Sequence, residues 1–345
     1  EVDELEFLYE YGLFLAKAAT LVVAIGLIIG LIVGSAVKHK SSRKGELHIE
    51  NLSEEKELEI EDVNRLMLSK EEVKAFDKQL KKDKKKTKVE EQDKPKPRLF
   101  VLDFIGDVDA SQVATFREEI TTVLTAAKEG DEVLINLESP GGVVHGYGLA
   151  ASQIARLKQA KINTTVAVDK VAASGGYMMA CVADKIIAAP FAIIGSIGVV
   201  AQLPNINRLL KRFDVDIEQH TAGNFKRTLT VLGENTEEGR EKFKQELAET
   251  HVLFKHFVQE HRPEVDIEQV ATGEHWYATQ ALEKHLVDKI QTSDDFLLTA
   301  LNEFQLFKVE YKIKQNVAEK LGLAAAAGLT KVMGKLSTWS ITNSK

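Results

Sequence analysis

Hydrophobic and polar positions divide the chain into stretches of different texture, and the first is the most apolar. Residues 18–37 form a run of twenty positions without a charge. At a rise of about 1.5 Å per residue, a helix of that length matches a hydrocarbon core about 30 Å thick. The acidic start of residues 1–17 and the length of the run disfavour a cleaved signal peptide. We therefore predict an N-terminal tail over 1–17 and a transmembrane helix over 18–37, with the lipid bilayer as a partner.

Basic residues are distributed unevenly around this run. Lys38, Lys40, Arg43 and Lys44 follow it, whereas Lys17 alone precedes it. The positive-inside rule then places the rest of the chain in the cytoplasm. Translocation of that part to the other side of the membrane is the alternative.

Residues 38–98 are predicted to form a charged, partly helical linker. Apolar positions recur at loosely helical spacing over residues 52–80. Six lysines then occupy the eight positions 81–88. A segment of this composition buries too little apolar area to offset chain entropy, so we expect it to be flexible from residue 81. Attraction to anionic lipid headgroups is the functional alternative.

From residue 99 apolar runs alternate with helical patterns. Strands are predicted at Leu99–Ile105, Glu132–Leu137 and Thr164–Val168, and helices at Ser111–Lys128 and Tyr147–Lys158. Alternation of this kind indicates an α/β fold with largely parallel strand pairing, assigned here to residues 99–300.

Two further apolar stretches need an interpretation. The run Ile186–Ala201 spans sixteen residues and contains Pro190, so buried core is a better interpretation than a second membrane span. Residues 301–345 are assigned to a C-terminal extension. Its later part, with an Ala-rich stretch over 321–329, fits either a weak amphipathic helix docked on a partner or membrane, or a poorly ordered tail.

Composition excludes several classes of protein. The net charge of −7 argues against nucleic acid as a partner, because phosphate neutralisation needs a basic surface. Cys181 is the single cysteine and cannot form an internal disulfide. His251, His256 and His261 recur every five residues, which rotates them around a helix and does not favour a metal site. No metal or cofactor is predicted.

The segment 138–142, which reads Glu-Ser-Pro-Gly-Gly, directly follows a predicted strand. Its proline fixes one dihedral angle, while the glycines allow positive φ and close backbone approach. Such a turn can aim the N–H group of Gly141 at a developing oxyanion. An ordinary turn at the end of a strand needs no function, so the motif is weak by itself.

Ser174 lies between a predicted strand and an apolar helical stretch, in the sequence Ala-Ala-Ser-Gly-Gly-Tyr. At a helix N-terminus the backbone N–H groups and the dipole favour negative charge. The N–H groups of Gly175 and Gly141 are therefore candidates for one oxyanion hole. The alternative is that Ser174 is simply an N-cap, which serine commonly is.

Lys226 is the candidate base, in the sequence Gly-Asn-Phe-Lys-Arg. A lysine can accept a proton from serine only when it is neutral, and burial among apolar groups favours the neutral amine. Phe225, Leu229 and Val231 are candidates for that environment, and Thr228 and Thr230 for orienting the amine. A solvated surface lysine is the plainer interpretation of this residue alone.

Taken together, the order Ser-Pro-Gly-Gly, Ser-Gly-Gly-Tyr-Met-Met-Ala and Gly-Asn-Phe-Lys resembles the signal-peptide-peptidase-A family of serine peptidases. The resemblance covers the anchor and essentially all of residues 99–295. It implies a ClpP/crotonase-like superhelix of ββα units, with Ser174 as nucleophile and Lys226 as general base. It further implies that Gly141 and Gly175 are the oxyanion donors.

The resemblance also implies a setting for the chemistry. It implies a bacterial inner membrane protein that cuts hydrophobic peptides, such as signal-peptide remnants or damaged membrane proteins, through an acyl-enzyme. Enzymes of the family assemble into rings, so a homo-oligomer is expected, and a neighbouring protomer is a candidate source of the base for each serine.

Three rival interpretations are kept. A crotonase-type acyl-CoA enzyme would share the fold and the oxyanion hole without a Ser-Lys pair. A Ser-His-Asp peptidase would use His145 or His220 as base. A membrane-tethered oligomeric scaffold would have no catalytic activity.

Overall fold

The computed structural model describes residues 9, 11–14, 17, 20, 45–93 and 96–313, with side chains undescribed over 83–93. The predicted transmembrane helix over 18–37 therefore lies outside the described residues, apart from Thr20. Among the helices that are described, none is both long and apolar enough to cross a bilayer. Contacts divide the chain into two units, residues 1–46 with 312–345, and residues 47–311.

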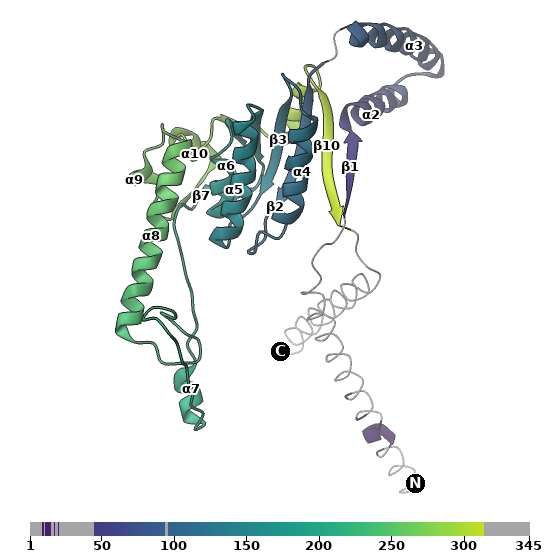
Figure 1. Ribbon diagram of the computed structural model, residues 1–345. Coiled ribbons are helices and arrows are strands. Elements are labelled where there is room, and N and C mark those ends of the chain that lie inside the picture. The colour runs from purple at the N-terminus through teal and green to yellow at the C-terminus, as the bar shows by residue number, and fades with distance from the viewer. Residues whose placement is uncertain are drawn as a thin grey trace. The chain divides into compact units, whose positions relative to one another are not determined.

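A seven-stranded sheet forms the centre of the second unit, in the order β1-β10-β2-β3-β4-β6-β9 (Figure 1). From β10 to β9 every neighbouring pair is parallel. The strands of the sheet are β1 (Gly45–Asn51), β2 (Arg98–Ile105), β3 (Glu132–Glu138), β4 (Asn163–Val168), β6 (Lys185–Ala188), β9 (Lys289–Ile290) and β10 (Gln305–Ile313). The structure thus confirms an α/β fold with mostly parallel pairing, and β10 extends the sheet beyond residue 300.

A smaller sheet of three strands, in the order β5-β7-β8, carries the site described below. Its strands are β5 (Val171–Ala173), β7 (Ile193–Gly195) and β8 (His275–Tyr277). β5 pairs with β7 in parallel, and β7 pairs with β8 in antiparallel fashion.

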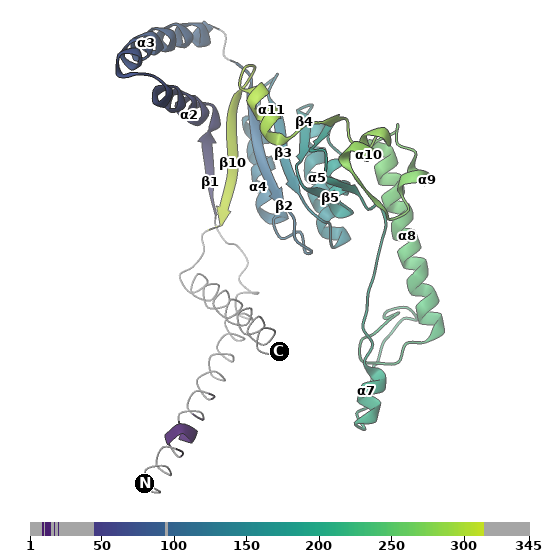
Figure 2. The ribbon, with the colours of Figure 1, turned by 180° about the vertical axis from the view of Figure 1, so that it is seen from behind.

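Helices cover both faces of the large sheet. Figure 1 shows α4, α5 and α6 on one face, and Figure 2 shows α11 on the other. The helices of this part are α4 (Val113–Ala126), α5 (Val144–Gln159), α6 (Gly175–Ala180), α9 (Ile267–Val270), α10 (Ala278–Glu283) and α11 (Ser293–Ala300). A parallel sheet that is covered on both faces needs strands that are apolar throughout.

β2 shows how the sequence meets that need. Phe100, Leu102 and Phe104 enter the core beneath α4 and α5, whereas Leu99 and Val101 enter a second core beneath α11. Alternate residues of a strand point to opposite faces, so one continuous apolar run fills both cores. The predicted runs at β2, β3 and β4 are confirmed within one residue. The prediction of buried core over Ile186–Ala201 holds for β6 and β7, whereas Phe191 (82% exposed) and Val200 (91% exposed) lie at the surface.

Two helices precede β2, namely α2 (Leu52–Met67) and α3 (Lys70–Asp93). Residues 81–93 belong to α3, where composition alone predicted a flexible chain. Lysine, glutamate and glutamine are good helix formers. The first turn of α3 carries Glu71 and Glu72, whose negative charges interact favourably with the helix dipole. Helix propensity therefore outweighs the poverty of apolar residues here.

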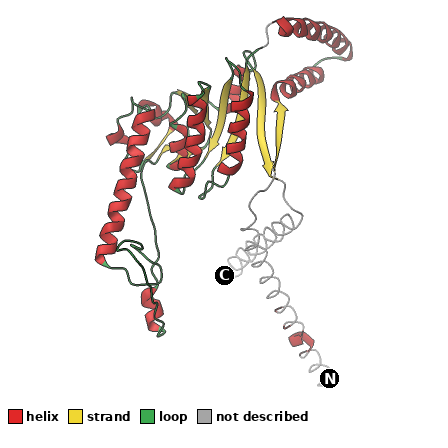
Figure 3. Ribbon diagram, in the orientation of Figure 1, coloured by secondary structure: helices red, strands yellow, loops and turns green. Residues whose placement is uncertain are grey.

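An extended segment, called here the arm, comprises residues 199–250 and includes α7 (Asn207–Arg212) and the first half of α8 (Glu237–His261). Figure 3 shows that most of it before α8 is loop. Within residues 201–236, all of which are described, only Gly233 is buried. The later part of α8 instead packs Phe254 and Val258 into the main core.

Candidate active site

Ser174 occupies a strained position between β5 and α6. Its backbone has φ 52° and ψ −117°, a conformation that residues with a Cβ rarely adopt and that costs on the order of 1–3 kcal/mol. Its N–H donates to the carbonyl of Gly195 at 2.8 Å, and its own carbonyl accepts from the N–H of Met178 at 2.9 Å. The hydroxyl makes no capping hydrogen bond, so the N-cap alternative does not explain this serine.

The turn over residues 138–142 is called here the glycine turn. Its Gly141 lies directly against the backbone at Ser174. A Cβ built on Gly141 would lie 2.7 Å from the carbonyl oxygen of Ala173 and from the Cβ of Ser174, and 2.8 Å from the nitrogen of Gly175. Its φ of +88° adds a second reason for glycine. Backbone hydrogen bonds hold the two segments together, from Ser139 N–H to Val171 O at 2.8 Å and from Ala173 N–H to Ser139 O at 3.0 Å. The structure thus brings three of the four predicted site residues into contact.

Gly175 is the first residue of α6, so its N–H has no acceptor within the helix. A Cβ on Gly175 would lie 2.4 Å from the ring of Tyr147, and one on Gly176 would lie 2.5 Å from the carbonyl oxygen of Ser139. The glycine pair after Ser174 therefore allows α6 to pack closely on α5 and on the glycine turn.

A series of short polar contacts runs behind the glycine turn. The N–H of Gly141 donates to Ser139 Oγ at 3.1 Å, Ser139 Oγ lies 2.5 Å from the Tyr147 hydroxyl, and that hydroxyl donates to the Asp107 carbonyl at 2.8 Å. Burial raises the pKa of Tyr147, so the phenol keeps its proton at neutral pH. Sequence reasoning missed Tyr147. Its position five residues beyond Gly142 was the only local signal in the sequence.

Lys226 lies elsewhere, in the exposed loop of the arm between α7 and α8. Its backbone N–H donates to the carbonyl of Gly223 at 3.2 Å. The side chain of the neighbouring Phe225 is itself 46% exposed, with the Lys242 ammonium 5.7 Å from its ring centre. In a single copy, therefore, the candidate apolar neighbours do not bury Lys226, because this loop has no core of its own.

The length of α8 separates the lysine loop from the core around α6. A Cβ on Gly239, in the first turn of α8, would lie 2.4 Å from the carbonyl oxygen of Thr228, so the loop rests on that end. Phe254, which shares the core of α6, follows fifteen residues later, or about 22 Å along the helix axis. Figure 1 likewise shows α7 at the opposite end of α8 from α6. One copy of the chain does not bring Lys226 to Ser174.

The other residues considered from the sequence have different surroundings. His145 is exposed in the first turn of α5, and His220 is exposed in the arm, with its ring nitrogen 3.5 Å from a Glu218 carboxylate oxygen. The hydroxyl of Thr230 accepts hydrogen bonds from the N–H groups of Leu232 and Gly233 at 3.3 Å, so it stabilises the local turn over residues 230–233. Over the described part of the chain, no three His, Cys, Asp or Glu side chains are grouped as metal ligands would be.

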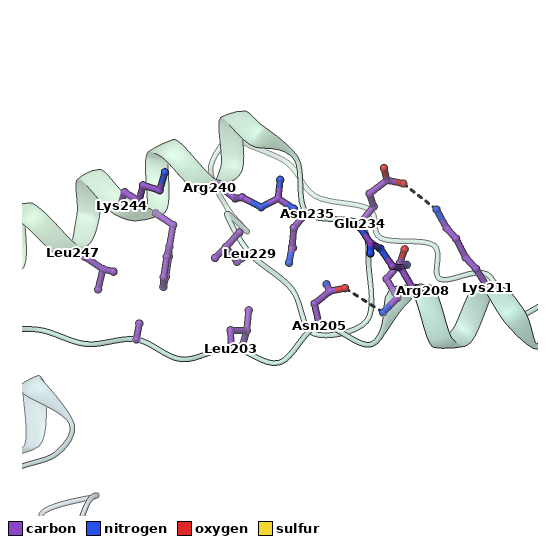
Figure 4. Close-up of a pocket in the computed structure, with 13 residues that line it drawn as sticks. Leu203, Asn205, Arg208, Lys211, Leu229, Glu234, Asn235, Arg240, Lys244 and Leu247 are labelled. Atoms are coloured by element: carbon purple, nitrogen blue, oxygen red, sulfur yellow. Dashed lines mark hydrogen bonds and ion pairs between the residues drawn. The ribbon is translucent and has the colours of Figure 1, made fainter.

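A cavity of about 760 Å³ opens in the arm, between α7 and the start of α8 (Figure 4). Leu203, Leu229 and Leu247 form part of its lining. Three of the cations that line it pair with carboxylates: Lys211 with Glu234 at 3.1 Å, Arg240 with Glu237 at 3.1 Å, and Lys244 with Glu241 at 2.7 Å. Neither Ser174 nor Lys226 lines this cavity, so it is not where the predicted catalytic residues meet.

Comparison with known families defines the class of protein. Residues 6–154 match the model of the peptidase family S49 N-terminal region, and residues 156–306 match the model of peptidase family S49. The boundary falls within α5, and the second region contains both Ser174 and Lys226. The chain belongs to peptidase family S49.

Two sequence relatives agree with this assignment. The chain is 51% identical to the "Probable protease SohB" of Haemophilus influenzae, over 96% of this chain and 97% of that protein. It is 53% identical to the protein of the same name from Buchnera aphidicola subsp. Schlechtendalia chinensis, over 86% of this chain and all of that protein. The membrane-bound stomatin-specific protease 1510-N, solved with a substrate peptide, aligns at 14% identity and a TM-score of 0.41, over 66% of this chain and 96% of that chain.

Proposed function

We propose that this chain is a membrane-anchored serine endopeptidase in which Ser174 of one copy is activated by Lys226 of another. The observation that carries the proposal is the turn at Ser174. A strained residue at the start of a helix, with a hydroxyl that caps nothing and two glycines at its sides, is what a nucleophile beside an oxyanion hole requires. Membership of a peptidase family favours peptides as substrates.

The reaction follows from these groups. The neutral amine of Lys226 takes the proton of Ser174 while Oγ attacks the peptide carbonyl carbon. The N–H groups of Gly141 and Gly175 stabilise the oxygen that becomes negative. The C–N bond then breaks, the departing nitrogen takes the proton from the lysine, and an acyl-enzyme is left on Ser174. Water, activated by the same amine, attacks the ester and restores the serine.

The arm supplies the argument for a second copy. An amine that accepts a proton from serine must be shielded from water, and in one copy Lys226 is exposed at the far end of α8. Contact between the arm and another copy would bury both the lysine and its apolar neighbours. A homo-oligomeric ring, as the family resemblance implies, provides that contact in a closed form.

The anchor and the substrate class complete the proposal. With residues 18–37 in the bacterial inner membrane, the peptidase unit stays beside the bilayer, where hydrophobic peptides concentrate. Signal-peptide remnants and damaged membrane proteins are then the substrates of choice. The positive-inside rule favours the cytoplasmic side.

A cleavage assay tests the proposal. An apolar fluorogenic peptide and a fluorophosphonate probe are applied to the full chain in detergent, as wild type, Ser174→Ala and Lys226→Ala. Both variants are expected to lose turnover by about a thousandfold or more, and Ser174→Ala to lose labelling. Ser152→Ala and Lys211→Ala, which remove an exposed hydroxyl and an arm lysine, are expected to cleave normally.

The rival interpretations predict other results. An acyl-CoA enzyme or a scaffold would leave wild type without peptide cleavage and Ser174 unlabelled. A Ser-His-Asp peptidase would lose activity with His145→Ala or His220→Ala and keep it with Lys226→Ala. Full turnover in Ser174→Ala would end the proposal.

A further inference from the structure

The contacts behind the glycine turn have a fixed direction. A hydroxyl carries one hydrogen, and a carbonyl oxygen can only accept. The Tyr147 hydroxyl donates its hydrogen to Asp107 O at 2.8 Å. The 2.5 Å contact between Ser139 and Tyr147 must then be made by the Ser139 hydrogen. Ser139 Oγ is left with lone pairs, and it accepts the N–H of Gly141 at 3.1 Å.

This series of contacts from Asp107 through Tyr147 and Ser139 to Gly141, called here the relay, is shielded from water. Tyr147 and Ser139 are both fully buried. Gly106 closes the relay from another side, since a Cβ there would lie 2.3 Å from the Tyr147 hydroxyl oxygen and 2.4 Å from Ser139 Oγ. Both hydroxyls are therefore shielded from bulk water, so each bond depends on the residue that makes it.

Tyr147 also contacts the second glycine of the site. Its ring lies against Gly175, where a Cβ would be only 2.4 Å from the ring. The ring therefore fixes how closely α6 approaches α5, and the hydroxyl fixes Ser139. Tyr147 thus contacts Gly175 directly and contacts Gly141 through Ser139.

We propose that Tyr147 and Ser139 are positioning residues that hold the N–H groups of Gly141 and Gly175 in the geometry of an oxyanion hole. The inference rests on the proposed function. Because the Ser139 hydrogen is committed to Tyr147, Ser139 can present only lone pairs to Gly141, and the direction of that N–H is set before substrate arrives. In the substrate-free chain this N–H donates to Ser139 Oγ at 3.1 Å, and in the proposed reaction the same N–H would be shared with the oxyanion.

Tyr147→Phe tests the relay, because it keeps the ring on Gly175 and removes only the hydroxyl. We expect kcat to fall by about ten- to a hundredfold, with KM for the peptide within about twofold, since the lost interaction acts in the transition state. A peptide aldehyde of the substrate sequence provides a second readout. It adds to Ser174 as a hemiacetal whose oxygen occupies the oxyanion position, and its inhibition constant is expected to rise by a similar factor.

Ser139→Ala and the double variant distinguish a relay from two separate structural effects. Ser139→Ala is expected to lower kcat as Tyr147→Phe does, and the double variant to be no slower than the slower single variant. Multiplied effects in the double variant would overturn the relay. Ser139→Ala also keeps the test usable if Tyr147→Phe fails to fold.

Tyr177→Phe is the matched control. It removes another fully buried hydroxyl, whose bond goes to the Leu286 carbonyl at 3.0 Å, away from the glycine turn. We expect it to reduce stability without changing aldehyde inhibition. Wild-type kcat and wild-type aldehyde inhibition in Tyr147→Phe would refute the relay even when Ser174→Ala is inactive. Activity in Ser174→Ala would instead refute the proposed function.

Discussion

Ser174 and Lys226 lie in regions of the chain that are packed very differently. The surroundings of Ser174 are buried, tied by backbone hydrogen bonds to β5, β7 and the glycine turn, and free of space for even one added methyl group at Gly141. The loop that carries Lys226 is exposed, and a Cβ at Gly223 within it would meet nothing within 4 Å. One region is therefore complete in a single copy, and the other is not.

The apolar residues of the arm point to what would complete it. Exposed apolar side chains recur along it at Val200 (91% exposed), Phe213 (72%) and Leu209 (50%). Exposed apolar groups gathered on one segment are typical of surfaces that bind a partner. If Lys226 is the base, as proposed above, it would become active only when the segment is covered, so assembly and catalysis would be coupled.

The largest effect that sharpens this comparison is expected at Gly141. In Gly141→Ala the new Cβ would lie 2.7 Å from backbone and from Ser174, so the turn must shift and activity is expected to fall by about a hundredfold or more. Gly130→Ala is the control, since its φ of +87° matches and its nearest neighbour would lie 3.8 Å away. Both variants should lose stability from the positive φ, and peptide cleavage should fall only in the first. Equal activities would show that the turn is not part of the site.

A smaller effect is expected in the arm, at Phe225. If another copy covers this residue, Phe225→Ala should shift the protein concentration needed for half-maximal activity upward by about tenfold, because it removes apolar area from the contact. Leu298→Ala on α11 removes a side chain that is 64% exposed and belongs to the part outside the arm, residues 47–198 and 251–311, called here the sheet unit. That control should leave the concentration dependence unchanged. Sedimentation and activity, measured over the same concentration series, decide the matter.

A third prediction concerns pH and lies within the sheet unit. Burial raises the pKa of Glu119 on α4 to about 7, with Glu310 and Asp103 adding repulsion and Lys308 opposing it. Its Oε1 accepts the N–H of Tyr311 at 2.9 Å, and its Oε2 is buried without a partner. Because the folded state holds this proton more tightly than the unfolded state, stability falls as pH rises from about 4.5 to about 7 and then levels off.

Glu119→Gln tests that assignment. Glutamine keeps an acceptor for Tyr311 and cannot ionise, so the variant should match wild type near pH 4.5 and exceed it above pH 7 by about 3 kcal/mol of unfolding free energy. Denaturant titrations at several pH values measure the difference. A wild-type advantage at pH 8 would contradict the buried, proton-binding carboxyl. Activity per folded molecule should not change, since Glu119 faces β10.

The sheet unit was largely predictable because its signals are local. The run at Leu99–Ile105 alternates between two cores, so it is apolar throughout, and the sequence shows this directly as a strand. The glycines beside Ser174 were also readable as sites of close backbone approach. The contact between Gly141 and Gly175 depends on the pairing of β5 with the segment at Ser139. The order of the motifs was nevertheless enough to predict that these two glycines lie together.

The parts that failed depend on distances that sequence spacing does not show. Tyr147 meets Ser139 eight residues away and the Asp107 carbonyl forty residues away, so the relay exists only in the folded chain. The apolar neighbours of Lys226 suggested burial, but α8 moves the whole loop away from the core. Hydrophobicity indicates that a residue is covered, and it does not say whether the cover comes from the same copy.

Mixing two inactive variants tests the shared dyad most directly. Ser174→Ala and Lys226→Ala are purified separately, combined at equal concentration, dissociated, reassembled and assayed with the apolar peptide. If each site takes its serine and its lysine from different copies, random assembly pairs an intact serine with an intact lysine in about one site in four, and activity should return to about a quarter of the wild-type value. Activity that stays at the level of the separate variants, in particles shown to contain both, would contradict the account.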